Sequence, residues 1–454
     1  MSPTSKARTT DAAQSGRLLF LAVLSLPVGA AAGFVGAMFR LTLDQANVLR
    51  NSLAEWAHGY SVVGPFSLVA SIAVATGVAA WLVRRFAPRA SGSGIPHVEA
   101  VLEEALSPAP PWLIPVKFVG GVLAIGAGLA LGREGPSVQM GASLAHLIGR
   151  LFRRNWDDCR VLMAAGAGAG LATAFNAPIA GAVFVLEELV RRFETRIAIA
   201  ALGASATAMV VARIFLGDGP EFVVLALPYP SAGAQILFFA LGVAAGVAAV
   251  AYNWAILAAI HAADRFGAWP VELRAALVGA VVGIFVWFTP DFVGGGESLT
   301  QQTLSGALAG GALAAVFVMR FGLGAVSYAA KTPGGLFAPM LVLGAQLGLL
   351  FATACEATTI SLAAPREAFA VVGMAAFFTG VVRAPVTGIV LIAEMTGSLT
   401  MLLPMLGACF AAMLVPTLLR NEPIYESLRK LDAPHPTTND QRLPSTFPTP
   451  PPPL

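Results

Sequence analysis

Long apolar stretches dominate this chain and restrict the environment in which it can fold. They cover residues 18–38, 65–83, 197–216, 236–260, 275–288, 308–318 and 402–418. Several are long enough to cross the hydrocarbon core of a bilayer, where an open-ended chain satisfies its backbone only as helices. Hydrophobic residues make up 57% of the chain and charged residues only 12%, against about 25% charged residues in a soluble domain. We therefore predict an all-α polytopic membrane protein with well over ten helical segments.

The charges and cysteines exclude several other classes of function. The formal net charge is +3, and the 28 basic residues are scattered along the chain, so we expect no nucleic-acid partner. The cysteines Cys159, Cys355 and Cys409 lie in or beside apolar segments and do not have the spacing of metal ligands. We predict no metal site and no cofactor.

The N-terminal residues leave two interpretations open. Basic residues precede the first apolar run, and the alanines at 30–32 resemble a signal-peptide cleavage site. The run continues to Met38, however, which favours a retained membrane helix. We expect a cytoplasmic segment at 1–17, a transmembrane domain at 18–431 and a disordered proline-rich tail at 432–454.

Further basic residues bear on topology. They gather at three places, residues 84–89, 150–154 and 191–196. If these face the cytoplasm, the positive-inside rule places the N-terminus there too. We expect a multi-pass protein of the cell membrane with both termini cytoplasmic, in the inner membrane if the source is bacterial.

An internal repeat is visible in three matched motifs. "GSG" at 92–94 matches "GGG" at 294–296, and "GPSVQMGA" at 135–142 matches "APMLVLGA" at 338–345. "NAPIAGAVFVLEEL" from Asn176 matches "RAPVTGIVLIAEMT" from Arg383. The matches keep one order at nearly one offset, which coincidence among Gly/Ala-rich helices explains poorly. We predict two related halves, at about 18–216 and 235–431.

Glycine just ahead of proline marks the breaks in the apolar segments. The breaks are "GSGIP" at 92–96, "GREGP" at 132–136 and "PGGLFAP" at 333–339. Proline suits the first turn of a helix, and glycine lets the preceding backbone approach a ligand. Helices that begin inside a membrane present unpaired N–H groups and the positive end of their dipole, which together attract an anion. Each motif alone could be a simple kink, but their joint occurrence predicts a transporter of a small anion.

In combination these motifs resemble the CLC family of chloride channels and chloride/proton antiporters. "GSGIP", "GREGP" and "GLFAP" occur in the family's order and are followed by Tyr425 in "NEPIY". The resemblance covers about residues 18–431. It implies the CLC fold, with two inverted-topology repeats and many discontinuous, tilted helices. It also implies a homodimer in the lipid bilayer, with one pathway per subunit for chloride and protons.

The acid in the second motif is the expected gate. Glu134 stands where a helix begins, so its carboxylate can occupy an anion site itself and leave when it is protonated. In the family the matching residue is the external gate and proton carrier. Glu134 aligns with Phe337 in the second repeat, so the acid is an addition to a repeated scaffold. The alternatives are a structural ion pair with Arg133 or a charge that only favours the start of the helix.

A second acid favours exchange over passive conduction. Glu187 aligns with Glu394, but its neighbour Glu188 aligns with Met395. The resemblance assigns Glu188 the inner proton-transfer role that is typical of antiporters. A salt bridge with Arg191 or Arg192 is the alternative. We expect chloride/proton exchange, with a voltage- or pH-gated chloride channel of the same fold as the second hypothesis.

The resemblance also supplies the chloride-binding residues. Ser93 and Tyr425 would donate hydroxyl groups, and Leu336 and Phe337 would donate backbone amides. Hydroxyls can bind chloride and still release it. The remaining members of the predicted chloride-binding set are Arg133, Gly135, Gly94 and Ile95. Arg133 would contribute its backbone N–H, and its guanidinium either attracts anions or pairs with a carboxylate. Helix capping by Ser93 and interfacial anchoring by Tyr425 are the alternatives.

Two residues depart from bacterial relatives, and one enzymatic hypothesis competes. Lys331 stands where a small residue is common, and it either attracts anions or extends to the interface. His97 stands where an acid is frequent, and it either tunes the pH response or is structural. Ser93 with His97 could suggest an intramembrane hydrolase, but two residues without a positioned third group are not a triad. We therefore expect no enzymatic activity.

Overall fold

The computed structural model describes residues 3–432 except 308, 309, 359 and 360, with side chains described between residues 18 and 431. Its regular structure in these residues is entirely helical. Eight of the described helices are long and apolar enough to cross a membrane. The predicted tail and the first residues of the run at 308–318 lie outside the described residues. Residues 3–17 of the predicted cytoplasmic segment are helical and belong to the same helix as the first apolar run.

The helices fall into two matching series. The first comprises α1 (Pro3–His58), α2 (Val63–Phe86), η1 (Pro88–Ala90), α3 (Ile95–Leu102), α4 (Leu113–Gly126), α5 (Glu134–Leu151), α6 (Trp156–Phe175), α7 (Pro178–Phe184), η2 (Val185–Leu189) and α8 (Thr195–Leu216). The second comprises α9 (Ala232–Arg265), α10 (Val271–Phe288), η3 (Pro290–Phe292), α11 (Glu297–Leu304), α12 (Gly310–Tyr328), α13 (Phe337–Ala357), α14 (Arg366–Val382), α15 (Pro385–Thr396), η4 (Leu399–Met401) and α16 (Leu402–Leu418). Helix α17 (Ile424–Asp432) follows without a counterpart. The element order thus repeats over the halves predicted from the motifs.

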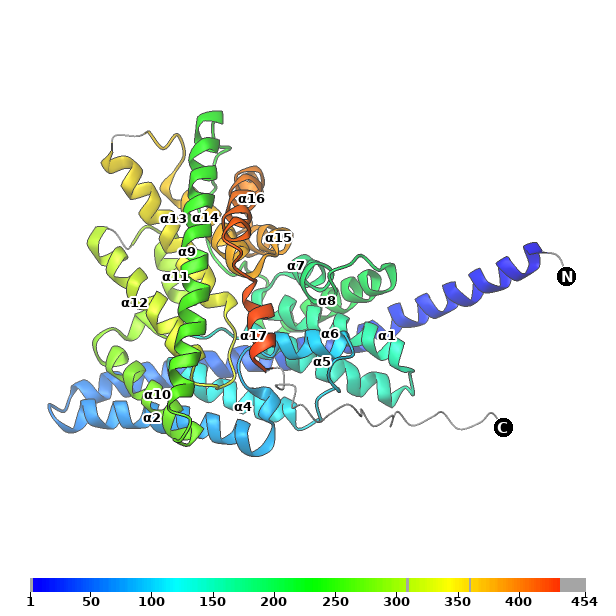
Figure 1. Cartoon of the computed structure of the whole chain (residues 1–454), viewed down its shortest axis with the longest axis horizontal. Coiled ribbons are helices and arrows are strands. Elements are labelled where there is room, and N and C mark those ends of the chain that lie inside the picture. Colours follow the sequence, from blue (N-terminus) through cyan, green and yellow to red (C-terminus); the bar gives the residue numbers. More distant parts are fainter. Residues whose placement is uncertain (1–2, 308–309, 359–360, 433–454) are drawn as a thin grey trace.

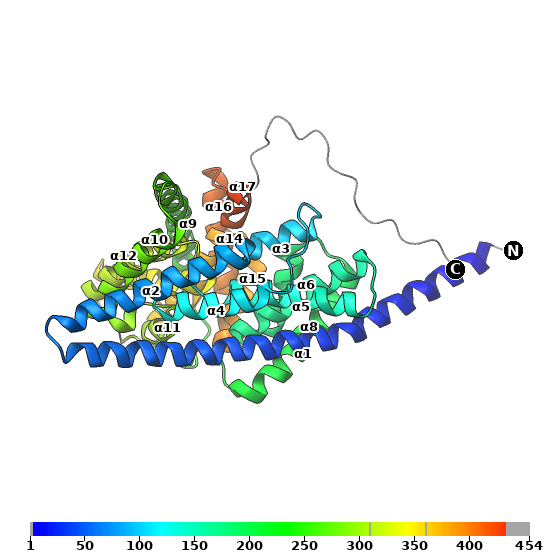
Figure 2. The same cartoon turned by 90° about the horizontal axis from the view of Figure 1, so that it is seen from below.

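The helices differ widely in length and direction. In Figure 1, α1 runs along the long axis of the molecule, whereas α9 stands upright across it. Figure 2 shows α2 returning alongside α1 after a tight connection. Short helices such as α3 and α11 have eight residues each, too few to cross a bilayer at 1.5 Å per residue. The predicted mixture of long tilted helices and interrupted ones is therefore present.

The centre of each repeat is a pair of helices packed through glycine. Helix α5 packs on α6, and α13 packs on α14 in the same way. A Cβ atom added to Gly141 would stand 3.0 Å from the carbonyl carbon of Gly166, and one added to Gly344 would stand 3.0 Å from that of Gly373. Membrane helices without a hydrophobic driving force between them use such small residues to approach closely. Nearly all of α6 and α14 is buried as a result.

A local two-fold relation connects the repeats. Gly132 and its repeat counterpart Gly335 exchange backbone hydrogen bonds of 2.8 and 2.7 Å in an antiparallel bridge. Because these residues lead into α5 and α13, the two helices start beside one another at corresponding places of the two repeats. Transporters built from inverted repeats bring interrupted helices together at the repeat interface in this way.

Candidate functional site

Three chain breaks meet beside this bridge. Besides the Gly132–Gly335 pair, the Gly92 N–H donates to the Thr332 carbonyl at 3.1 Å, and the Gly334 N–H donates to the Gly92 carbonyl at 3.1 Å. The segments that precede α3, α5 and α13 are therefore joined by their own backbones. The three motifs predicted to begin helices inside the membrane lie together, and their helix starts are neighbours.

Buried cations support the glycine loops of both repeats. The fully buried Lys117 Nζ donates to the carbonyls of Ala90 at 3.0 Å and Gly92 at 2.7 Å. Arg320, its counterpart in α12, donates to the carbonyls of Phe292, Gly294 and Gly295 at 2.8–3.3 Å. Each cation satisfies carbonyl groups that have left regular helix. Both therefore hold non-helical backbone in place inside the protein.

The Glu134 side chain lies against the N-terminal end of helix α13. Its side chain is fully buried, and its Oε1 accepts a hydrogen bond of 2.7 Å from the backbone N–H of Phe337, the first residue of α13. A Cβ on Gly132 or Gly335 would collide with this carboxylate. The absence of side chains at both glycines leaves the space that the carboxylate fills. A carboxylate in this position is favoured by the amide and by the positive end of the helix dipole.

Two buried hydroxyl groups lie in the same region. The Ser93 Oγ and Tyr425 Oη atoms are fully buried and make no hydrogen bond with described residues. Tyr425 interacts electrostatically with Glu134 and through its hydroxyl with the Ser93 side chain, and its ring centroid is 5.9 Å from that of Phe337. Buried polar groups without a partner require an explanation, such as a ligand. Neither alternative holds, because Gly94 rather than Ser93 is the N-cap of α3 and Tyr425 lies inside the protein.

Small and apolar residues of the predicted set complete the surroundings. A Cβ on Gly135 would come within 2.6 Å of the Ser93 Oγ and carbonyl oxygen, so α5 can start against this loop only with glycine. Gly94 has a φ of 84°, a conformation that glycine adopts without strain, and it turns the chain into α3. Ile95 and Leu336 are fully buried at the starts of α3 and α13.

The side chain of Arg133 is engaged elsewhere. Its Nε donates to the Ala174 carbonyl at 2.8 Å, and its Nη2 pairs with the Glu221 carboxylate at 2.5 Å. Glu297 lies 3.7 Å from the same guanidinium. Of the two roles considered for this guanidinium, the structure shows pairing with a carboxylate, and that carboxylate does not belong to Glu134.

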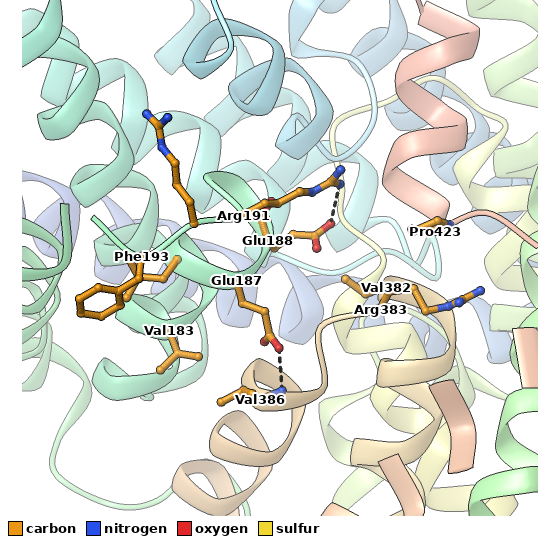
Figure 3. A pocket seen from close by; sticks show the side chains of 11 residues that line it. Val183, Glu187, Glu188, Arg191, Phe193, Val382, Arg383, Val386 and Pro423 are labelled. Atoms are coloured by element: carbon orange, nitrogen blue, oxygen red, sulfur yellow. Dashed lines mark hydrogen bonds and ion pairs between the residues drawn. The ribbon is translucent and has the colours of Figure 1, made fainter. Parts of the chain in front are cut away.

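Glu188 lines an open pocket that contains none of the predicted chloride-binding residues. The pocket has a volume of about 560 Å³ and is lined by Val183, Leu186, Glu187, Glu188, Arg191, Arg192, Phe193, Val382, Arg383, Val386 and Pro423. In Figure 3 the Arg191 guanidinium points toward Glu188, with a separation of 3.7 Å between Nη2 and Oε1. Arg192 pairs instead with Glu194 at 3.3 Å. The ion-pair alternative for Glu188 is thus a long contact with Arg191.

The repeat-related acids behave differently from the unshared one. Glu187 accepts hydrogen bonds of 3.0 and 2.6 Å from the N–H groups of Val386 and Thr387, at the start of α15. Glu394 accepts bonds of 3.1 and 2.7 Å from Ile179 and Ala180, at the start of α7. Each repeat therefore caps a helix of the other. This agrees with a structural role for the shared acids.

The two departures from bacterial relatives have specific contacts. The Lys331 Nζ pairs with Asp264 Oδ1 at 2.7 Å, so the ammonium group binds an acid at the end of α9. The His97 Nδ1 lies 3.3 Å from Gln139 Nε2, and its Nε2 has no described partner. Neither nitrogen contacts the Ser93 hydroxyl among the described hydrogen bonds. The residues of the hydrolase hypothesis thus do not form a pair.

Two residues near the site were not singled out in the sequence. Both carboxylate oxygens of Glu99 are buried without a hydrogen-bond partner, and the side chain interacts with Glu188. Lys117 supports the Ser93 loop. A single charge within an otherwise apolar segment was the available signal for both. Within the described part of the chain, no cluster of three metal-ligating side chains occurs.

Comparison with known proteins agrees with this architecture. Residues 75–417 match the family described as "Voltage gated chloride channel". The chain is 36% identical over 421 residues to the "H(+)/Cl(-) exchange transporter ClcA" of Vibrio parahaemolyticus serotype O3:K6, covering 89% of this chain and 88% of that protein. It is also 36% identical over 435 residues to the protein of the same name from Vibrio cholerae serotype O1 strain O395, covering 92% and 90%.

A solved structure gives the same result at the level of the fold. The crystal structure of a slow cyanobacterial Cl⁻/H⁺ antiporter superposes with a TM-score of 0.82 at 30% identity, covering 90% of this chain and 97% of that one. The family match, the two relatives and this fold agree with the converging helix starts described above. The protein is therefore a multi-pass membrane protein that belongs to the voltage-gated chloride channel (CLC) family, a family of transporters rather than enzymes.

Proposed function

We propose that this protein exchanges chloride for protons across the membrane, with Glu134 as the gate. The observation that carries the proposal is the hydrogen bond from the Phe337 amide to the Glu134 carboxylate at the start of α13. A carboxylate in that place occupies a position that also suits a chloride ion. Protonation removes its charge and the reason to stay, so an anion enters while the glutamate carries a proton.

Chloride binding uses the groups around this position. The Ser93 and Tyr425 hydroxyls are buried, interact with each other, and make no hydrogen bond of ordinary geometry with the described residues, so they are available as donors to an anion. The amides at Leu336 and Phe337 add the positive end of a helix. Neutral donors hold an anion weakly enough to release it, as transport requires. Chloride is thus the substrate, and the proposed site uses no cofactor.

Glu188 is the proposed inner proton-transfer residue, whereas Glu134 is the proposed external gate. It lies at the edge of an open pocket and interacts with the buried Glu99, so protons can reach a carboxylate inside the protein from that pocket. The names of the relatives also favour exchange, since both sequence relatives are called exchange transporters and the solved structure is called an antiporter.

Reconstitution in liposomes tests exchange directly. An imposed chloride gradient should drive protons uphill against their own gradient, measured with a pH-sensitive dye while a chloride electrode follows the anion. Chloride flux without proton movement would show a passive channel of the same fold and overturn the exchange mechanism. Mixed gradients of chloride, nitrate and fluoride in the same vesicles give the anion selectivity.

We propose that both termini face the cytoplasm. The Arg154 guanidinium lies 4.4 Å from the ring centroid of Phe20, near the start of the apolar part of α1, and Asp158 pairs with Arg196 at 2.8 Å. Two of the basic clusters therefore lie at the N-terminal end of the first span. Glu426 of α17 is 4.0 Å from Arg191, which places the C-terminal helix near a basic cluster too. The positive-inside rule supports a cytoplasmic location for this face.

A homodimer with one pathway per subunit is proposed as the working assembly. All residues of the proposed chloride site come from one chain, so a second subunit is not needed to complete it. Apolar side chains on α8, α15 and α16 are exposed, among them Val210, Val386 and Phe410. This surface can pack against a second copy as well as against lipid. The assembly is tested by measuring the mass of the protein–detergent complex and subtracting the mass of the bound detergent, which should leave the mass of two chains.

A further inference from the structure

The segment between α8 and α9, which connects the two repeats, contains Glu221. Among the described ion pairs of this segment, Glu221 is the one residue that pairs with two arginines. Its side chain is 4% exposed and contacts Arg133 at 2.5 Å and Arg40 at 2.8 Å. It lies between α8 and α9, in a stretch without helix. The connection between the repeats therefore does more than join them, because it carries the acid that neutralises two cations.

The same segment is fastened to both repeats. The Asn176 side chain donates to the Gly219 carbonyl at 2.6 Å, and the Phe222 N–H donates to the Met395 carbonyl at 3.0 Å. The Gln301 amide both donates to and accepts from the Val223 backbone, at 2.9 Å each. Glu221 is thus held in a fixed position next to Arg133, as an acid on a free loop would not be.

Arg133 is the residue directly before the proposed gate. Its guanidinium and the Glu134 carboxylate interact electrostatically, but its N–H groups are used by Glu221 and the Ala174 carbonyl. The other charged groups near this arginine are Arg40, Asp44 and Glu297. Only Glu221 binds it at hydrogen-bond distance among the described side chains.

We propose that Glu221 is a positioning residue of the transport cycle, which keeps the Arg133 guanidinium from capturing either the released Glu134 carboxylate or an incoming chloride ion. An unpaired guanidinium beside the gate would bind both anions strongly. Transport needs anion sites that release as readily as they bind. This inference rests on the proposed gating role of Glu134.

The test is Glu221→Gln in liposomes, read as chloride efflux at varied chloride concentration. Freeing the guanidinium should lower the half-saturating chloride concentration about three- to tenfold and lower the maximum rate. Glu221→Asp, which keeps the charge, should stay within about twofold of wild type. Asp218→Asn is the matched control, since Asp218 is an acid of the same segment that is exposed and pairs with Arg213; it should change neither value.

Two double variants separate positioning from mere loss of structure. In an Arg133→Gln background, Glu221→Gln should no longer alter the half-saturating chloride concentration. In a Glu134→Ala background, it should lower the maximum rate less than in the wild type, because chloride is the one anion left for the guanidinium to capture. An undiminished shift of the half-saturating concentration in the Arg133→Gln background, an undiminished loss of maximum rate in the Glu134→Ala background, or an unchanged half-saturating concentration in the single variant would each overturn the inference. These readouts use chloride alone, so absent proton movement in the wild type would refute the proposed exchange without deciding the role of Glu221.

Discussion

At the scale of single residues, the proposed exchange depends on the hydrogen bond that the Phe337 amide donates to the Glu134 carboxylate. The carboxylate accepts a hydrogen bond from the Phe337 amide and interacts with its own backbone amide, and its Oε2 makes no hydrogen bond of ordinary geometry with described residues. One amide and a helix dipole hold a charge well enough to localise it, but less firmly than a buried cation would. At this scale, a change of charge on one side chain should separate proton movement from chloride movement.

Glu134→Gln removes the charge and keeps the size of the side chain. Proton transport should fall to the background rate because an amide carries no proton through the cycle, whereas chloride flux should continue. Parallel recordings of proton and chloride flux in liposomes measure both effects. Glu55→Gln, a change at an exposed acid of α1, should leave both fluxes as they are. Proton transport at the wild-type rate in Glu134→Gln would refute the gating role.

Glu188→Gln should uncouple the two ions at a different step. Without an acid at the pocket edge, protons lose their route to the interior while the anion site stays intact. The expected result is chloride flux within about threefold of wild type with little or no proton movement, as for the loss of a positioned proton-transfer group. The reversal potential in opposed chloride and proton gradients measures the coupling. A reversal potential that still depends on the proton gradient would contradict the assignment.

At the level of the elements, the glycine before α5 provides room for the gate. A Cβ on Gly132 would meet only atoms of the Glu134 carboxylate among its nearest neighbours. Gly132→Ala should therefore displace the carboxylate from the α13 amide and reduce coupled proton transport about tenfold or more, since a collision of this kind costs on the order of 1–3 kcal/mol.

The same substitution has an internal control. In a Glu134→Ala background the colliding atoms are gone, so Gly132→Ala should have little further effect on chloride flux. Gly407→Ala, at a position in α16 with no atoms within 4 Å of the new Cβ, should be silent. Equal damage in both backgrounds would show that the alanine disturbs the backbone bridge instead.

The two buried cations allow a comparison between repeats. Lys117→Met and Arg320→Met each leave loop carbonyls without a donor, and each should lower the free energy of unfolding by about 1–3 kcal/mol per lost bond. Thermal denaturation in detergent measures this loss. Only Lys117→Met should also raise the half-saturating chloride concentration, because its loop contains Ser93. The same rise in Arg320→Met would mean that the effect comes from stability and not from the loop.

The motifs were sufficient to predict where helices begin, but not how their side chains would pair. Glycine followed by proline reports a local backbone preference, and the starts of α3, α5 and α13 follow from it. The pairing of Arg133 with Glu221 depends on a segment 88 residues away. Sequence spacing carries no information about such a contact, so the sequence left both roles of this arginine open.

At the level of the whole molecule, each chain contains a complete proposed site. In a tandem dimer with Glu134→Gln in one half, proton transport should therefore be about half that of the wild-type tandem, with the remaining half fully coupled. Proton and chloride fluxes normalised to the amount of reconstituted protein measure this ratio. Complete loss of proton transport would show that the two subunits share one pathway.

The repeat was the part of the architecture that the sequence predicted most fully. Its motifs recur at nearly one offset, and the series α1–α8 and α9–α16 follow the same order. Helix α17 could not be predicted from the repeat because it has no counterpart in the first half. Tyr425 was the one residue in it that the motifs indicated. The position of Glu99 beside Glu188 depends on the packing of α3 against η2, which no motif in either segment encodes.

The exchanged caps of Glu187 and Glu394 have a consequence for biosynthesis. During synthesis, α7 is made long before Glu394. Until the second half follows, the Ile179 and Ala180 amides at the start of α7 therefore lack the carboxylate that caps them in the folded protein. A product truncated between the two halves should therefore be degraded in the cell faster than the full-length chain.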